Sequence, residues 1–202
     1  MALTIRPADK IKINVIEFLI DKYPGVIIGN EVMYGTTRKV VDLLALYNGE
    51  TYAIEIKSDK DNVRRLPEQL KEYALIFDHT IVFTHSKLLQ DILSIVRPNV
   101  SVYNVLNERI EPISISQRQN RPIKREMLYS ISSAYLKRFL DTNKNLDSDK
   151  IREHILRSNK RGAIHFMLYK FLEEKLISGF NLFMKEKKFI DDLSLLSTRL
   201  NL

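Results

Sequence analysis

Residues 40–57 read VVDLLALY-NG-ETYAIEIK, two apolar runs separated by Asn48-Gly49. Asn-Gly between apolar runs strongly indicates a two-residue type I′ hairpin turn, because both central positions need a positive φ. With this turn, paired residue numbers sum to 97 and Asp42 faces Glu55. Both runs are apolar at successive positions, so we expect central strands that are covered on both faces of a sheet.

The preceding run, residues 26–34, reads VIIGNEVMY and reaches the same strand through the connection 35–38. If that connection closes a second hairpin, paired numbers sum to 73 and Glu31 also faces Asp42. A one-residue slip would move Glu31 to the other face. The sequence therefore predicts a row of three carboxylates across three strands.

A row of carboxylates needs a counter-charge, because like charges opposed at roughly 5 Å destabilise a sheet. Buried charges normally pair or bind metal, and Mg²⁺ prefers carboxylate oxygens. Lys57 lies two residues after Glu55 and so on the same face of the strand. It could balance part of the charge, orient a water or hold a phosphate. The alternative is a structural salt-bridge cluster of Lys57 with Glu55 and Asp42.

The pattern of Asp42, twelve intervening residues and then Glu55-Ile56-Lys57 resembles the core of the PD-(D/E)xK nuclease superfamily, in its Holliday-junction-resolvase and RecB-like branches. The resemblance implies that the aspartate and glutamate hold magnesium and that the lysine assists the attacking water or stabilises the transition state. It covers residues from about 10 to 105. The proline of the superfamily name is absent, since Val41 precedes Asp42.

Gln69 and Tyr73 lie four apart, hence on one helix face, and resemble a glutamine and a tyrosine that follow the Glu-x-Lys strand in RecB-like nucleases. The segment 58–66 resembles a subgroup of small bacterial and phage proteins of the superfamily, and there Arg64 or Arg65 would contact phosphate. The alternative for Gln69 and Tyr73 is that they form an ordinary amphipathic helix edge. The alternative for the two arginines is that they lie in a solvated turn.

Glu17 is a second candidate for the third carboxylate, because superfamily members often supply one from the first helix. On a helical wheel it falls at the polar margin beside Asp21, as a plain surface glutamate would. The predicted strand pairing places Glu31 opposite Asp42, so we rank Glu31 ahead of Glu17.

These residues predict a magnesium-dependent enzyme that hydrolyses DNA phosphodiester bonds, with Asp42 and Glu55 holding the metal with help from Glu31, Gln69 close to the site, and Lys57 acting on the water. Mn²⁺ should substitute for Mg²⁺. Two rivals remain: a nuclease fold that only binds DNA or protein, and a phage or mobile-element protein that acts on a host partner through its C-terminal helices. The resemblance leaves a homodimer open.

Composition limits the other classes of function. The chain has 202 residues, no cysteine, and no apolar stretch near the roughly 18 residues of a membrane span. Its N-terminus lacks signal-peptide organisation, so we expect a cytoplasmic protein without disulfides or thiolate metal sites. Its four histidines have no metal-ligand spacing.

The pattern of elements predicts an α/β fold, a restriction-endonuclease-like α/β/α sandwich with a mixed sheet, followed by an all-helical region. We expect a nuclease-like core at 1–105, a linker at 106–125 and a basic helical domain at 126–202. The expected strands are 26–34, 39–47, 50–57, 80–84 and 100–105, and the expected helices are 8–22, 61–77, 86–96, 124–141, 147–158, 162–178 and 182–199.

Charge is unevenly divided between the two parts. Residues 1–120 hold 15 basic and 15 acidic side chains, whereas 121–202 hold 17 and 10, so the net +7 lies in the helical part. Such a surface suits a phosphate-rich substrate, although a solvated basic face is an equally good interpretation. The first residues to test would be Arg157, Lys160, Arg161, Lys185, Lys187 and Lys188.

Overall fold

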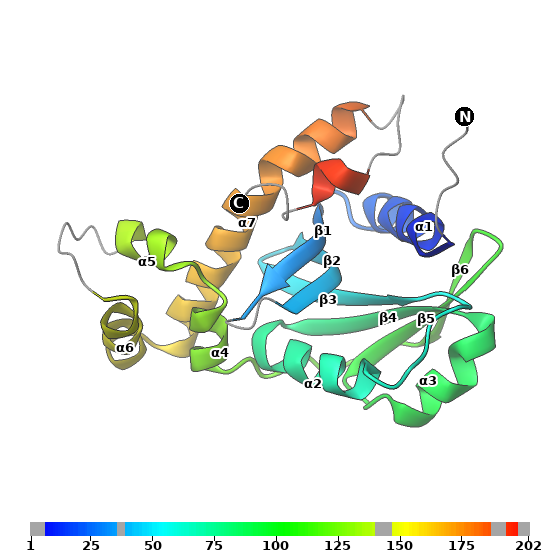
Figure 1. Ribbon diagram of the computed structural model, residues 1–202, viewed down its shortest axis with the longest axis horizontal. Coiled ribbons are helices and arrows are strands. Elements are labelled where there is room, and N and C mark those ends of the chain that lie inside the picture. The colour runs from blue at the N-terminus through cyan, green and yellow to red at the C-terminus, as the bar shows by residue number, and fades with distance from the viewer. Residues whose placement is uncertain (1–6, 36–38, 140–146, 187–192, 198–202) are drawn as a thin grey trace.

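A mixed six-stranded sheet with flanking helices organises the part of the chain that the computed structural model describes, residues 7–35, 39–139, 147–186 and 193–197 (Figure 1). The strands follow the sequence order across the sheet: β1 (Ile27–Tyr34), β2 (Lys39–Tyr47), β3 (Glu50–Lys57), β4 (His79–His85), β5 (Val100–Leu106) and β6 (Arg109–Ser114). The helices are α1 (Pro7–Lys22), α2 (Leu66–Ile76), α3 (Leu89–Ile95), α4 (Lys124–Tyr129), α5 (Ser133–Phe139), α6 (Ser148–Ser158) and α7 (Arg161–Glu186), with short 3-10 turns η1 (Ser86–Leu88) and η2 (Leu193–Leu196). This architecture confirms the predicted α/β class with a C-terminal helical region.

The registers of both predicted hairpins are confirmed. Pairs between β2 and β3 run from Tyr47 with Glu50 to Leu43 with Ile54, and every pair sums to 97. Asn48 and Gly49 have φ values of 50° and 79°, as a type I′ turn requires. The paired residue numbers of β1 and β2 sum to 73. Of the connection expected at 35–38, residues 36–38 lie outside the described residues. Strands β3, β4 and β5 are parallel, as crossover helices between them require.

Helices cover both faces of the sheet (Figure 1). One face packs against α1, the C-terminal part of α7 and η2, through residues such as Ile16, Phe83 and Phe180. The other face packs against α2, α3 and the helices α4, α6 and α7 in one hydrophobic cluster that includes Leu44 and Leu168. The C-terminal helices therefore share a core with the sheet.

The segment 106–125 is not wholly the linker that its polar, non-periodic sequence suggested. Asn107 and Glu108 turn the chain with φ values of 46° and 70°, and β6 then pairs antiparallel with β5 at the sheet edge. Pro112 is tolerated because an edge strand does not need every backbone donor. Ile123 N donates to Leu75 O at 2.8 Å, so the end of the segment is also fastened to the core.

Two predictions for the helical region were wrong. The single helix expected at 124–141 is divided into α4 and α5. Two helices were expected at 162–178 and 182–199, but one continuous helix, α7, covers the first and runs into the second. Gly179 sits inside α7, where an added Cβ would lie 2.6 Å from the backbone oxygen of Leu195. The glycine is therefore explained by the close approach of η2 rather than by a helix break.

No helix in the described ranges combines the length and the apolar character that crossing a bilayer would require.

Candidate functional site

Strands β2 and β3 bring Asp42 and Glu55 to one pocket of about 230 Å³, which Glu31 and Lys57 also line. Asp42 lies one position beyond the last recorded pair of the hairpin, Leu43 with Ile54. Its Oδ2 accepts a 2.9 Å hydrogen bond from the backbone N–H of Ile56, which fixes one carboxylate oxygen. The structure thus brings to one pocket the three carboxylates that the sequence analysis placed opposite one another and the lysine that it placed on the same face.

Three donors surround the buried carboxylate of Glu55. Lys57 Nζ donates to Oε1 at 2.7 Å, and Gln69 Nε2 donates to the same oxygen at 2.7 Å. Tyr73 donates its hydroxyl proton to Oε2 at 2.6 Å. Gln69 and Tyr73 reach the strand together because they lie one turn apart on α2. This network holds Glu55 in one orientation.

The two carboxylates influence each other electrostatically. Burial, and then the nearby negative charge of Glu55, raises the pKa of Asp42 to about 6, although the Ile56 N–H and the lysines Lys12 and Lys57 oppose the rise. Burial and the charge of Glu55 also raise the pKa of Tyr73, so its hydroxyl remains a donor at any physiological pH. A cation placed between Asp42 and Glu55 would relieve their repulsion.

Glu31 lines the pocket but has a cationic neighbour from the first helix. Its Oε1 lies 3.5 Å from Nζ of Lys12. Glu31 also has a φ of 52°, which is uncommon for a residue with a side chain, and it is missing from the β1–β2 ladder although its neighbours pair on both sides. Within the described ranges, no three acidic or histidine side chains lie close enough to share a metal ion. The expected three-carboxylate metal cluster is therefore not assembled in this structure.

Glu17, the alternative third carboxylate, faces another part of the surface. It lines a separate hollow with Asp21 and Glu108. The residues of α1 that line the pocket of Asp42 are Asp9 and Lys12 instead.

The two arginines proposed to contact phosphate lie beyond the pocket. Arg64 and Arg65 are both exposed, and Arg65 lines a neighbouring pocket of about 230 Å³. Gln69 lines that second pocket as well and donates to Glu55, so it connects the two. Arg65 thus shares a pocket with Gln69, a residue that contacts Glu55, whereas Arg64 lines neither pocket.

Lys12 and Asp61 are pocket residues that the sequence analysis missed. Lys12 is buried and its position on α1 coincides with the apolar stripe that includes Val15, Ile16 and Leu19, so a lysine among apolar positions was the available signal. Asp61 accepts hydrogen bonds from the backbone N–H and the hydroxyl of Ser58 at 2.7 Å and 2.6 Å. It closes the turn after β3.

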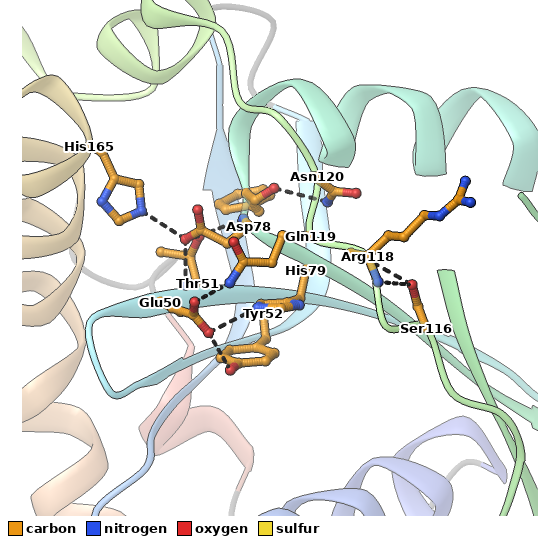
Figure 2. Close-up of polar contacts among 11 residues, drawn as sticks. Glu50, Thr51, Tyr52, Asp78, His79, Ser116, Arg118, Gln119, Asn120 and His165 are labelled. Atoms are coloured by element: carbon orange, nitrogen blue, oxygen red, sulfur yellow. Dashed lines mark hydrogen bonds and ion pairs between the residues drawn. The ribbon is translucent and has the colours of Figure 1, made fainter. Parts of the chain in front are cut away.

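A second polar network lies where the β2–β3 turn meets the start of β4 and α7 (Figure 2). Asp78 accepts hydrogen bonds from the backbone and hydroxyl of Thr51 at 2.9 Å and 2.8 Å, and His165 Nε2 lies 2.8 Å from the same carboxylate oxygen. Glu50 binds Tyr52 and His79 in the same region. This network connects α7 to the sheet through the half-buried His165 and the buried Asp78.

The basic side chains of the helical part are on the surface. Arg157, Lys160, Arg161 and Lys185 are exposed, while Lys187 and Lys188 lie outside the described residues. Arg157 pairs with Glu153 on its own helix at 2.5 Å.

Fold and site together define an α/β protein that combines a mixed sheet with a carboxylate and lysine pocket at the β2–β3 hairpin. The chain belongs to the family described as bacteriophage P4 protein cII, whose sequence model matches residues 1–197. A family of phage proteins agrees with the phage association suggested by the sequence. A comparison with curated proteins gave no match.

Two solved structures are similar to this chain. A protein of unknown function from Silicibacter pomeroyi is 15% identical, with a TM-score of 0.50 over 77% of this chain and 94% of that chain, which supports the fold alone. SfsA of Pyrococcus furiosus, solved in complex with Ca²⁺, is 18% identical, with a TM-score of 0.30 over 55% of this chain and 61% of that chain. The latter likeness is too slight to carry an argument.

Proposed function

We propose that this protein is a metal-dependent nuclease that hydrolyses DNA phosphodiester bonds, as a member of the PD-(D/E)xK superfamily. The observation that carries the proposal is the shared pocket of Asp42, Glu55 and Lys57, in which burial and Glu55 raise the pKa of Asp42 to about 6. A carboxylate with a raised pKa beside a lysine in an open pocket is typical of catalytic sites.

The donor set fits a hard divalent cation. Asp42 and Glu55 offer carboxylate oxygens, and waters would complete a shell that Mg²⁺ or Mn²⁺ accepts. The repulsion between these two groups supports the fit, because burial and the charge of Glu55 both raise the pKa of Asp42, and a bound cation would offset that neighbouring negative charge. When bound, the ion supplies Lewis-acid stabilisation of the phosphate and a lower pKa for water.

The remaining residues have positioning and electrostatic roles in this proposal. Tyr73 and Gln69 hold Glu55 in place through their hydrogen bonds. Lys57, at 2.7 Å from Glu55, stands where its ammonium would counter negative charge that develops on a phosphate. Preorganised charge of this kind needs no rearrangement during the reaction.

DNA is the proposed substrate because of the distribution of charge. The net +7 of the chain comes from residues 121–202, and exposed cations there include Lys160 and Arg161. Such cations give affinity for phosphate backbones that does not depend on sequence.

Cleavage assays with linear, circular, single-stranded and branched DNA in Mg²⁺ or Mn²⁺ test the proposal. Asp42→Ala and Lys57→Ala should each reduce metal-dependent cleavage by at least about 10²-fold while the circular dichroism spectrum is retained. The matched controls Asp91→Ala on α3 and Lys87→Ala on η1 change exposed residues outside the pocket and outside the basic helical part, and should cut at the wild-type rate. Undiminished cleavage by both site variants would exclude the assignment.

A second candidate function is a nuclease-like protein that binds DNA or a protein partner without cutting. Both oxygens of Glu55 already accept hydrogen bonds from protein donors, which favours a structural role for this carboxylate. Calorimetry that detects DNA binding but no heat from Mg²⁺ or Mn²⁺ would support this candidate over the enzyme.

A further inference from the structure

Lys12 lines the same pocket as Glu55 and Lys57 but has its own set of partners. Its buried Nζ donates to Asn30 Oδ1 at 3.0 Å and lies 3.5 Å from Oε1 of Glu31. Asn30 in turn donates from Nδ2 to the backbone oxygen of Leu193 at 3.3 Å, which fixes the direction of its amide. The ammonium group of Lys12 is therefore held in place from α1, β1 and η2.

The pocket therefore contains two separate ion pairs. Lys57 pairs with Glu55 and Lys12 pairs with Glu31, while Asp42 experiences the positive charge of both lysines. We propose that Lys12 is a positioning residue that removes Glu31 from the metal ligands and limits the pocket to a single divalent cation, held by Asp42 and Glu55. This inference rests on the proposed metal-dependent function.

Charge argues against a second cation in the same pocket. Two-metal sites place their ions roughly 4 Å apart and need carboxylates around both. The pocket is lined by five carboxylates and two lysines, a formal charge of −3. Of these acids, Asp61 is committed to Ser58 and Glu31 to Lys12. A second divalent ion beside Glu31 would lie next to the Lys12 ammonium and be repelled by it.

The backbone of β1 supports the same assignment. Glu31 adopts a φ of 52° within a strand, between Asn30 and Val32, which both keep their ladder pairs. A non-glycine residue remains in this conformation only when its surroundings hold it there. Lys12 supplies such restraints at two successive residues, through its hydrogen bond to Asn30 and its ion pair with Glu31.

Titration of the full-length protein with Mn²⁺ alone, followed by isothermal calorimetry, tests the inference. The wild type should bind one Mn²⁺. Glu31→Gln should change the dissociation constant by no more than about threefold, whereas Asp42→Asn should weaken binding by at least about 100-fold. If Glu31→Gln weakened binding as much as Asp42→Asn, Glu31 would be a ligand and the inference would be overturned.

Lys12→Met tests the role of the lysine directly, because it keeps the length of the side chain and removes its charge. We expect the first Mn²⁺ to bind about tenfold more tightly and a second Mn²⁺ to appear. The double variant Lys12→Met/Glu31→Gln should lose that second ion. Glu31→Gln alone decides the inference if Lys12→Met fails to fold, as judged by circular dichroism.

The outcomes separate this inference from the proposed function. Two Mn²⁺ ions in the wild type would overturn the single-cation inference while leaving the enzyme proposal intact. No Mn²⁺ in the wild type would overturn the metal-dependent function and the inference together.

Discussion

The hydroxyl of Tyr73 donates a 2.6 Å hydrogen bond to Oε2 of Glu55, and both side chains are buried. The bond joins α2 to the central strand β3 at the candidate site. Because a buried carboxylate without donors is costly, this contact stabilises the fold as well as the orientation of Glu55.

Tyr73→Phe should therefore destabilise the protein by about 1–3 kcal/mol, since it removes the donor and leaves Oε2 of Glu55 buried. Urea denaturation at pH 7 measures the change. Tyr34→Phe is the matched control, because Tyr34 donates at 3.1 Å to Glu72, which is only partly buried, and we expect a cost below about 1 kcal/mol. Equal losses in the two variants would contradict a special role for the Tyr73 bond.

Asp42 should make the metal-free protein less stable at neutral pH. Its folded pKa of about 6 exceeds the ordinary value of 3.8, so the folded state is favoured while the carboxyl is protonated. The stabilisation is complete below pH 3.8 and is lost as pH rises through about 6. At about 1.4 kcal/mol per pH unit, the difference amounts to at most about 3 kcal/mol.

Asp42→Asn should accordingly raise the free energy of unfolding at pH 8 in EDTA and leave it nearly unchanged at pH 4. Urea titrations at the two pH values measure this, with Asp91→Asn on the surface of α3 as the control. A loss of stability at pH 8 would show that the carboxylate is not under electrostatic stress. For the same reason, Mn²⁺ binding by the wild type should weaken as pH falls below about 6.

The ion pair between His165 and Asp78 should make stability depend on pH above neutrality. The hydrogen bond with Asp78 raises the pKa of His165. Burial by itself would raise the pKa of Asp78, but the hydrogen bonds from His165 and Thr51 lower it overall. Arg161 and Glu50 also face the histidine, with opposite effects on its pKa. The contribution of His165 is complete below pH 6.5 and is lost as pH rises through its raised folded pKa.

His165→Gln should abolish about 1 kcal/mol of the stability difference between pH 6 and pH 9, because glutamine can still donate a hydrogen bond but does not titrate. Urea denaturation at both pH values provides the measurement. His154→Gln on the exposed face of α6 should behave as the wild type. An unchanged pH dependence in His165→Gln would assign the effect to other groups.

Gly179→Ala should destabilise the protein by about 1–3 kcal/mol, because the new Cβ would lie 2.6 Å from the backbone oxygen of Leu195 and would push η2 away from α7. Gly162→Ala on the same helix meets nothing within 4 Å and should be neutral or stabilising by up to about 1 kcal/mol. Thermal unfolding of the two variants distinguishes a packing requirement from helix propensity, which would predict the same sign for both.

Local signals predicted the elements that surround the site. Asn48-Gly49 determined the β2–β3 register, and the four-residue spacing of Gln69 and Tyr73 placed both on the face of α2 that reaches Glu55. These predictions succeeded because turn geometry and helical periodicity depend on residues that are close in sequence. The chemical roles of the residues stay a prediction.

Long-range packing explains the errors. The polar character of residues 106–125 suggested a linker, but β5 offers an edge on which β6 pairs. Two helices were expected at 162–178 and 182–199, but α7 runs through Gly179, where η2 approaches the helix closely. In each case a contact with another element outweighed the local sequence pattern.

The sequence by itself determined that Asp42, Glu55 and Lys57 gather at one hairpin, because the turn fixes the register and side chains alternate along each strand. Only the tertiary structure decided that Lys12, and not Glu17, enters the pocket from α1 and pairs with Glu31. The rotation of a helix over a sheet is set by the packing of its whole buried face, which no local spacing specifies.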